Sequence, residues 1–126
     1  MNRQTYKQIS KQLDQAAKDI MKGKQPEYTN NNKDVLHNFK SSAEVLGLQP
    51  MEVWAVFFHK HVQAILSHAH NPGMEKAEPI NSRYADAINY LHLGYALMTE
   101  REKAIQKVAT GQIDIIAGTE GGYIIE

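Results

Sequence analysis

The sequence predicts an all-α fold, a bundle of four to five helices followed by a short β-hairpin-like tail. Apolar residues recur every three or four positions through several long stretches, as they do on one face of a helix. Pro50 and Pro79 stand where such stretches begin, and a proline suits the first turn of a helix because its missing N–H costs nothing there. Gly47 and the run 71–73 (Asn-Pro-Gly) separate the stretches. The length of 126 residues fits one domain, residues 1–126.

The N-terminal segment, residues 1–24, is predicted to form a basic amphipathic helix. Gly23, Pro26 and the three asparagines at 30–32 predict that the helix ends at residue 22 and that a loop covers 24–32. Residues 1–24 hold six basic and two acidic residues, which is typical of a solvated helix face or, alternatively, of a surface that docks an acidic partner. Its apolar residues form one narrow stripe at steps of three and four: Tyr6, Ile9, Leu13, Ala16, Ala17 and Ile20.

Three more helices are predicted within a helical core at 33–108. The second is expected at 33–46 with Gly47 as its C-terminal cap, the third at 50–70, and the fourth from residue 80 to about 108. The side chains expected to point inward from the second helix are Val35, Leu36, Phe39, Ala43 and Leu46. The third helix is expected to run through Trp54, Phe57, Phe58, His61, Ile65 and Leu66 to about residue 70.

The fourth helix is apolar on more than one face. A helix of this kind packs on both sides, in a core or at an interface between copies, so we expect a homo-oligomer. Beyond it, the Ile- and Gly-rich residues 112–126 form two short β-branched runs around glycines, which predicts a hairpin. One apolar face of the fourth helix consists of Ile80, Tyr84, Ala87, Ile88, Leu91, Tyr95 and Met98. The other consists of Tyr90, Leu93 and Leu97.

Composition narrows the classes of function. Lys and Arg total 14, as do Asp and Glu, and a formal net charge of zero disfavours general nucleic-acid binding. The chain has no cysteine, which excludes disulfides and thiolate zinc sites. The longest apolar run, residues 53–58, is far short of the about 20 residues that span a membrane. We therefore expect a cytoplasmic protein without a membrane segment.

Polar residues on the fourth helix are the first candidates for a binding site. Arg83, Asp86 and Asn89 follow at three-residue steps, and Tyr90 lies four residues after Asp86, so the four share a stripe on a largely apolar helix. Arg83 could pair with Asp86 along the helix. Alternatively, Arg83 could meet an anion in a pocket where Asp86 and Asn89 read a hydroxyl or a base edge.

Histidines and aromatic residues elsewhere complete the predicted ligand-binding set. His61 is either a hydrogen-bonded core residue or a ligand-binding one. His61 and His68 are two turns, or about 10 Å, apart, too far to share one ion, so we expect no metal site. No nucleophile motif is present and no catalytic residue is assigned. Asn38 beside Phe39 could read and stack on a base. The predicted ligand-binding residues are Tyr28, Asn38, Phe39, Trp54, Lys60, His61, Arg83, Asp86, Asn89 and Tyr90.

Three parts of the sequence form one pattern: Asn38-Phe39, residues 54–61, and the run Glu78-Pro79-Ile80, Ser82-Arg83-Tyr84 and Asp86 to Leu91. This pattern resembles small phage-encoded all-α proteins that are described only as nucleotide-modification-associated or of unknown function. These are distantly similar to the MazG-like all-α nucleotide pyrophosphohydrolases. The resemblance covers roughly residues 28–98. It implies a helical bundle, often dimeric, with a nucleotide-sized pocket between helices.

The chain departs from those hydrolases at the metal ligands. They hold magnesium with a Glu-x-x-Glu pair on one helix and a Glu-x-x-Asp pair on the next, whereas here Glu52 has no partner carboxylate three residues on and Arg83 precedes Asp86. We therefore expect an accessory protein of phage type, without catalysis or cofactor. It would bind a nucleotide-derived small molecule or a host protein during host takeover or defence evasion, in the host cytoplasm. The alternatives are a magnesium-dependent nucleoside triphosphate pyrophosphohydrolase and a pure protein-interaction module.

Overall fold

The chain folds into four α-helices in the computed structural model, which describes residues 1–29, 33–73 and 79–111, without the side chains of 25–29. The helices are α1 (Arg3–Thr29), α2 (His37–Leu46), α3 (Pro50–His70) and α4 (Ile80–Ala109). This confirms the all-α prediction. The predicted hairpin at 112–126 lies outside the described residues.

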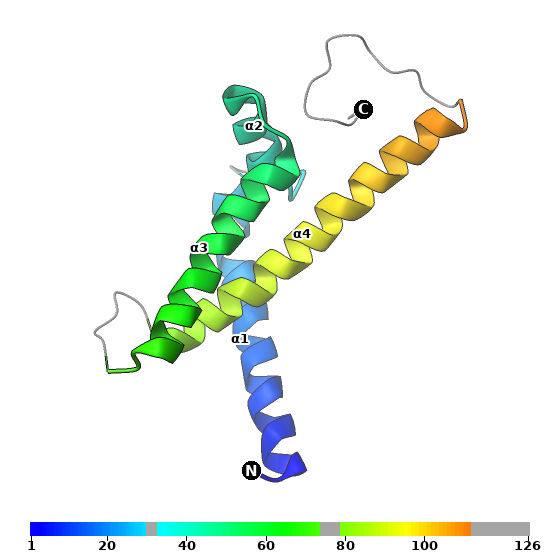
Figure 1. Cartoon of the computed structure of the whole chain (residues 1–126). Coiled ribbons are helices and arrows are strands. Elements are labelled where there is room, and N and C mark those ends of the chain that lie inside the picture. The colour runs from blue at the N-terminus through cyan, green and yellow to red at the C-terminus, as the bar shows by residue number, and fades with distance from the viewer. Residues whose placement is uncertain (30–32, 74–78, 112–126) are drawn as a thin grey trace.

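The long helices α3 and α4 form an antiparallel pair around which the other two are arranged (Figure 1). They pack side by side near the ends that the 71–79 connection joins, and they diverge toward their other ends. Helix α1 crosses α4, and α2 packs on α3. The N-terminal half of α1 and the C-terminal end of α4 extend beyond the region where the helices meet. In the described part of the chain, no helix is both long and apolar enough to cross a bilayer.

A small core lies where α2, α3 and α4 meet. Leu97 of α4 is fully buried, with 0% of its surface exposed. Trp54 and Phe58 of α3 pack against this core from its edge. The buried residues that form it are Leu36, Phe39, Ala43, Val53, Tyr90, Leu93 and Leu97.

The turn from α2 to α3 follows the predicted chemistry. Gly47 has φ 69°, a left-handed conformation that glycine adopts without steric cost, and the Leu48 N–H donates to the Ala43 carbonyl at 2.9 Å. Pro50 opens α3. The Gln49 N–H, left without a partner within the helix, donates to the Glu52 carboxylate at 2.9 Å. The predicted bounds of α3 and of α4 agree with the structure.

The predicted end of the first helix is wrong. Helix α1 passes through Gly23 and Pro26 and reaches Thr29, so the loop expected at 24–32 is helical up to residue 29. A glycine within a helix costs only about 1 kcal/mol relative to alanine, which tertiary packing can offset. Nothing in the structure explains how the larger cost of Pro26 is offset.

The second helix begins four residues later than predicted, at His37. Asp34 supplies the reason, because its carboxylate accepts the Leu36 N–H at 2.9 Å and its carbonyl accepts the His37 N–H at 3.1 Å. This local turn competes with helix at 33–36. Two residues predicted to face inward from the second helix are exposed instead, Val35 to 42% and Leu46 to 63%.

Lys40 ties the start of α2 to α4. Its ammonium lies 2.6 Å from a carboxylate oxygen of Asp34 and 2.6 Å from one of Glu100. Burial acts most strongly on the pKa of Lys40 and lowers it, but the hydrogen bonds and charges of Asp34 and Glu100 together raise the pKa above 10.5. Burial likewise raises the pKa of Asp34, and Lys40, Leu36 and His37 outweigh it, so that pKa falls below 3.8.

We expect Lys40→Met to lower the free energy of unfolding at neutral pH by about 1 kcal/mol, because both carboxylates remain partly exposed and regain water. The depressed pKa of Asp34 stabilises the fold above pH 3.8, and this contribution is lost as pH falls through the folded value. The raised pKa of Lys40 stabilises the fold below pH 10.5 and is lost as pH rises through the folded value.

The difference in the free energy of unfolding between wild type and Lys40→Met should therefore shrink toward both extremes of pH. Urea unfolding over a range of pH measures this difference. The raised pKa of Tyr90, caused by burial and then by the Asp86 charge, adds an alkaline loss of stability that both proteins share. A difference that stays constant from acid to alkaline pH would contradict this assignment.

Candidate functional site

The predicted stripe Arg83, Asp86, Asn89 and Tyr90 lies on the inner side of α4, but its members do not meet in one pocket. Asp86, Asn89 and Tyr90 are buried, with 4%, 4% and 8% of their surfaces exposed, and Arg83 is partly exposed. Helix α4 lies between α1 and α3, so residues only three or four positions apart face different neighbours.

Asp86 faces α3. Its Oδ2 lies 3.9 Å from Nδ1 of His61, which is within ion-pair range but longer than a hydrogen bond. Its Oδ1 is buried and has no hydrogen-bond partner within the described part of the chain. A buried carboxylate in this state destabilises a fold unless a proton, a water molecule or a neighbouring charge compensates it. A polar neighbour of Asp86 is thus His61 on another helix, with which it forms an ion pair only when the imidazole is protonated.

Asn89 faces α1. Its amide Nδ2 donates to the carbonyl of Ala17 at 2.8 Å, and both residues are buried. This hydrogen bond joins residues 72 positions apart in the sequence. It fixes where α1 crosses α4, so a structural role for Asn89 is established beside any role in binding.

Tyr90 belongs to an aromatic cluster. Its ring lies 4.7 Å from that of His61, 6.1 Å from that of Phe39 and 6.5 Å from that of Phe57, measured between centroids. Trp54 stacks on Phe58 at 5.1 Å and donates its indole N–H to the Tyr90 carbonyl at 2.6 Å. Phe39 and Tyr90 are buried and Trp54 and Phe58 are partly buried, so these rings pack as core, whereas Phe57 lies at the exposed edge of the cluster.

The remaining predicted residues are spread apart. Lys60 is exposed on α3, and Asn38 is partly buried on α2. Tyr28 was expected in a loop, but its backbone lies in the last turn of α1, and its side chain is outside the described residues. Of the ten predicted ligand-binding residues, the structure brings Phe39, Trp54, His61, Asp86 and Tyr90 together on the α3 side of α4.

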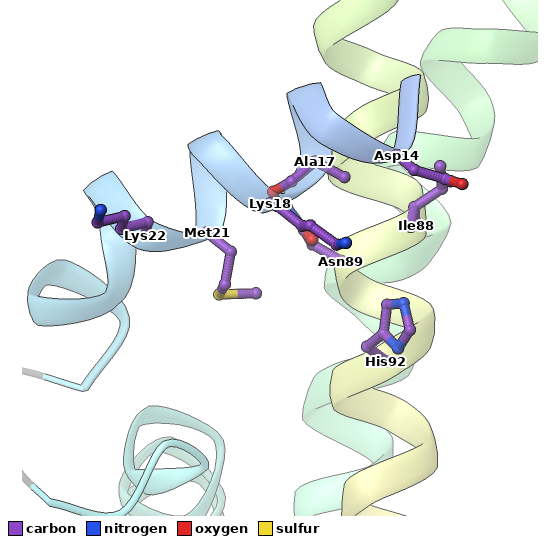
Figure 2. A pocket seen from close by; sticks show the side chains of 8 residues that line it. All are labelled: Asp14, Ala17, Lys18, Met21, Lys22, Ile88, Asn89 and His92. Atoms are coloured by element: carbon purple, nitrogen blue, oxygen red, sulfur yellow. Dashed lines mark hydrogen bonds between the residues drawn. The ribbon is translucent and has the colours of Figure 1, made fainter. Parts of the chain in front are cut away.

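A groove of about 630 Å³ opens on the other side, between α1 and α4 (Figure 2). Lys18 and Lys22 lie one turn apart on its α1 wall, and Asn89 and His92 lie on its α4 wall. Met21 and Ile88 supply apolar surface, and Asp14 lies toward the N-terminal end of the α1 wall. The lining residues are Asp14, Ala17, Lys18, Met21, Lys22, Ile88, Asn89 and His92.

Only Asn89 belongs both to this groove and to the predicted site. The sequence held one signal for the groove, the basic excess of residues 1–24, which includes Lys18 and Lys22. The three-residue steps of the polar stripe continue from Asn89 to His92, a signal in the sequence that the predicted site did not use. Within the described residues, no three histidine, aspartate or glutamate side chains gather closely enough to hold a metal ion.

Comparisons of the chain with family models, with curated proteins and with solved structures give no match. The groove and the buried Asp86–His61 pair are therefore interpreted from their own chemistry.

Proposed function

We propose that this chain binds a small, anionic, nucleotide-derived molecule in the groove between α1 and α4, without transforming it. The observation that carries the proposal is the lining of the groove, about 630 Å³ in volume, to which α1 contributes two lysines and α4 an amide and an imidazole. Pockets for small ligands usually have volumes of roughly 300–1,000 Å³ and combine apolar surface with a few polar groups.

Each wall has a distinct task in this proposal. The ammonium groups of Lys18 and Lys22 are point charges that suit phosphate oxygens. Met21 and Ile88 offer apolar surface on which a flat ring can lie, with His92 beside it. Asp14 repels an anion, so the phosphate end is directed to Lys22 and a hydroxyl or amino group of the ligand to Asp14.

The hydrolase alternative needs several carboxylates around one magnesium ion. Of the acidic residues that the structure describes, Asp14 lines the groove, whereas Asp86 is buried against His61 on the other side of α4. The resemblance to phage proteins would place such a binder in host takeover or defence evasion, by sequestering a nucleotide-derived signal. A protein-interaction role is favoured by one separate observation, the exposed apolar face of α4 described below.

The test is calorimetric titration and thermal unfolding with mono-, di- and triphosphate nucleosides, cyclic nucleotides and ADP-ribose, with and without Mg²⁺. A ligand present at a hundred times its Kd should stabilise the fold by about 2.7 kcal/mol. Lys18→Glu should weaken binding at least about tenfold, equivalent to about 1.4 kcal/mol. Raising the ionic strength should also weaken it.

Lys60→Glu is the matched control, since it makes the same change of charge at an exposed lysine of α3 away from the groove. It should bind as the wild type does. Equal loss of binding in both variants, or no binding by any member of the panel, would contradict the proposal. Release of pyrophosphate in the presence of Mg²⁺ would support the hydrolase instead.

A further inference from the structure

Helix α4 carries apolar residues on two opposite faces, and within the described residues only one of these faces is covered. The covered face consists of residues that pack on α1, α2 and α3: Ala85, Asp86, Asn89, Tyr90, Leu93, Gly94 and Leu97. The open face lies roughly half a turn away, at 100° per residue. Its residues, called the seam here, are Tyr84, Ile88, Leu91, Tyr95 and Met98.

The seam is exposed among the residues that the structure describes. Tyr95 is 70% exposed, Leu91 55% and Tyr84 42%, whereas Ile88 and Met98 are half-buried. Large apolar side chains gathered in a continuous row on a helix mark an interaction surface, unlike single ones scattered over a protein. The small core, in which Leu97 is the one large side chain described as fully buried, leaves these residues for a partner to cover.

The spacing of the seam selects a helix as that partner. Its residues follow one another at four, three, four and three positions. This is a repeat of 3.5 residues, which keeps a row of side chains facing one neighbouring helix, whereas a straight helix has 3.6 residues per turn. The chain's own residues 112–126 are rich in β-branched residues and glycine, so they are poor helix formers and do not match this seam.

The charge of the seam points to a second copy. Between residues 84 and 99 the only charged side chain is Asp86, which is buried on the opposite face, so the seam selects neither an acidic nor a basic partner. Two copies with a formal net charge of zero do not repel each other. We propose that the chain forms a two-fold symmetric dimer through the seams of two α4 helices.

The next residue of the repeat decides the direction of pairing. Glu102, four residues after Met98, is exposed and would face its own copy in a parallel pair, which places like charges in contact. An antiparallel pair leaves Glu102 beyond the seam. Tyr84 then faces Tyr95 of the other copy, and Ile88 faces Leu91, so that two apolar layers lie between two aromatic ones.

The first experiment measures the mass of the full chain by sedimentation velocity over a concentration series. We expect twice the 14.2 kDa of the single chain. The double variant Leu91→Glu, Tyr95→Glu should be monomeric with unchanged helical content. Val45→Glu, at a residue of α2 that is 85% exposed and outside the seam, should remain dimeric. A wild-type chain that stays monomeric at every concentration overturns the proposal, as does a dimeric double variant.

The absence of cysteine from the chain permits a second test that does not depend on the glutamate variants folding. A chain with Tyr84→Cys and Tyr95→Cys should form covalent dimers on oxidation. These two positions lie about 16 Å apart along one helix, too far for a disulfide within a chain. Tyr95→Cys alone should not cross-link, because it faces Tyr84 of the other copy. Failure of the double variant, or equal cross-linking by the single one, overturns the antiparallel seam. The seam and the groove share Ile88, so both tests of the dimer leave Ile88 unchanged.

Discussion

Leu97→Ala is expected to lower the free energy of unfolding by about 3 kcal/mol, the middle of the range for such truncations in cores. Leu97 is 0% exposed and lies at the centre of the cluster formed by α2, α3 and α4. The methyl groups that the substitution removes leave a cavity, because long helices crossing at fixed points cannot collapse freely around it. The loss is a large share of the 5–15 kcal/mol that stabilise a typical domain.

Urea unfolding followed by circular dichroism, at one protein concentration, measures this loss. The control is Val45→Ala, which removes methyl groups from a side chain that is 85% exposed and should change the free energy of unfolding by less than about 0.5 kcal/mol. Equal effects of the two substitutions would show that the core does not centre on Leu97.

The starts and ends of helices could be predicted where local chemistry decides them. Gly47 and Pro50 act through backbone geometry within a few residues, so their sequence pattern is sufficient, whereas the contact of Glu52 with the start of α3 was not predicted. The end of α1 could not be predicted in the same way. Gly23 and Pro26 weaken a helix locally, yet α1 continues past both, since contacts with distant helices also contribute to its stability.

The site was harder to predict than the fold, because a helical stripe does not say which neighbour covers it. Asp86 and Asn89 are one turn apart, but the first faces His61 on α3 and the second faces Ala17 on α1. The groove joins Lys18 to His92 across most of the described chain. Residues so far apart in the sequence come together because of the way α1 crosses α4. The spacing of apolar residues along each helix does not predict that crossing.

Gly94→Ala is expected to destabilise the protein by about 2 kcal/mol, although alanine is the better helix former by about 1 kcal/mol. A Cβ at Gly94 would overlap the Trp54 ring, closer than atoms can approach. The indole would have to move, and it would lose its hydrogen bond to the Tyr90 carbonyl and its stacking on Phe58. A fall in tryptophan order, seen as a weaker near-ultraviolet circular dichroism signal, should accompany the loss, because Trp54 is the only tryptophan.

Gly23→Ala is the matched control for this prediction. Gly23 also lies within a helix, but a Cβ there meets nothing within 4 Å among the described residues beyond its own helix backbone, so the same substitution should stabilise the protein by about 0.5–1 kcal/mol. The two changes are chemically identical and differ only in what surrounds the added methyl group. Opposite signs in urea unfolding would place the close approach of α3 and α4 at Gly94, whereas a stabilising Gly94→Ala would mean that Trp54 does not pack against that residue in solution.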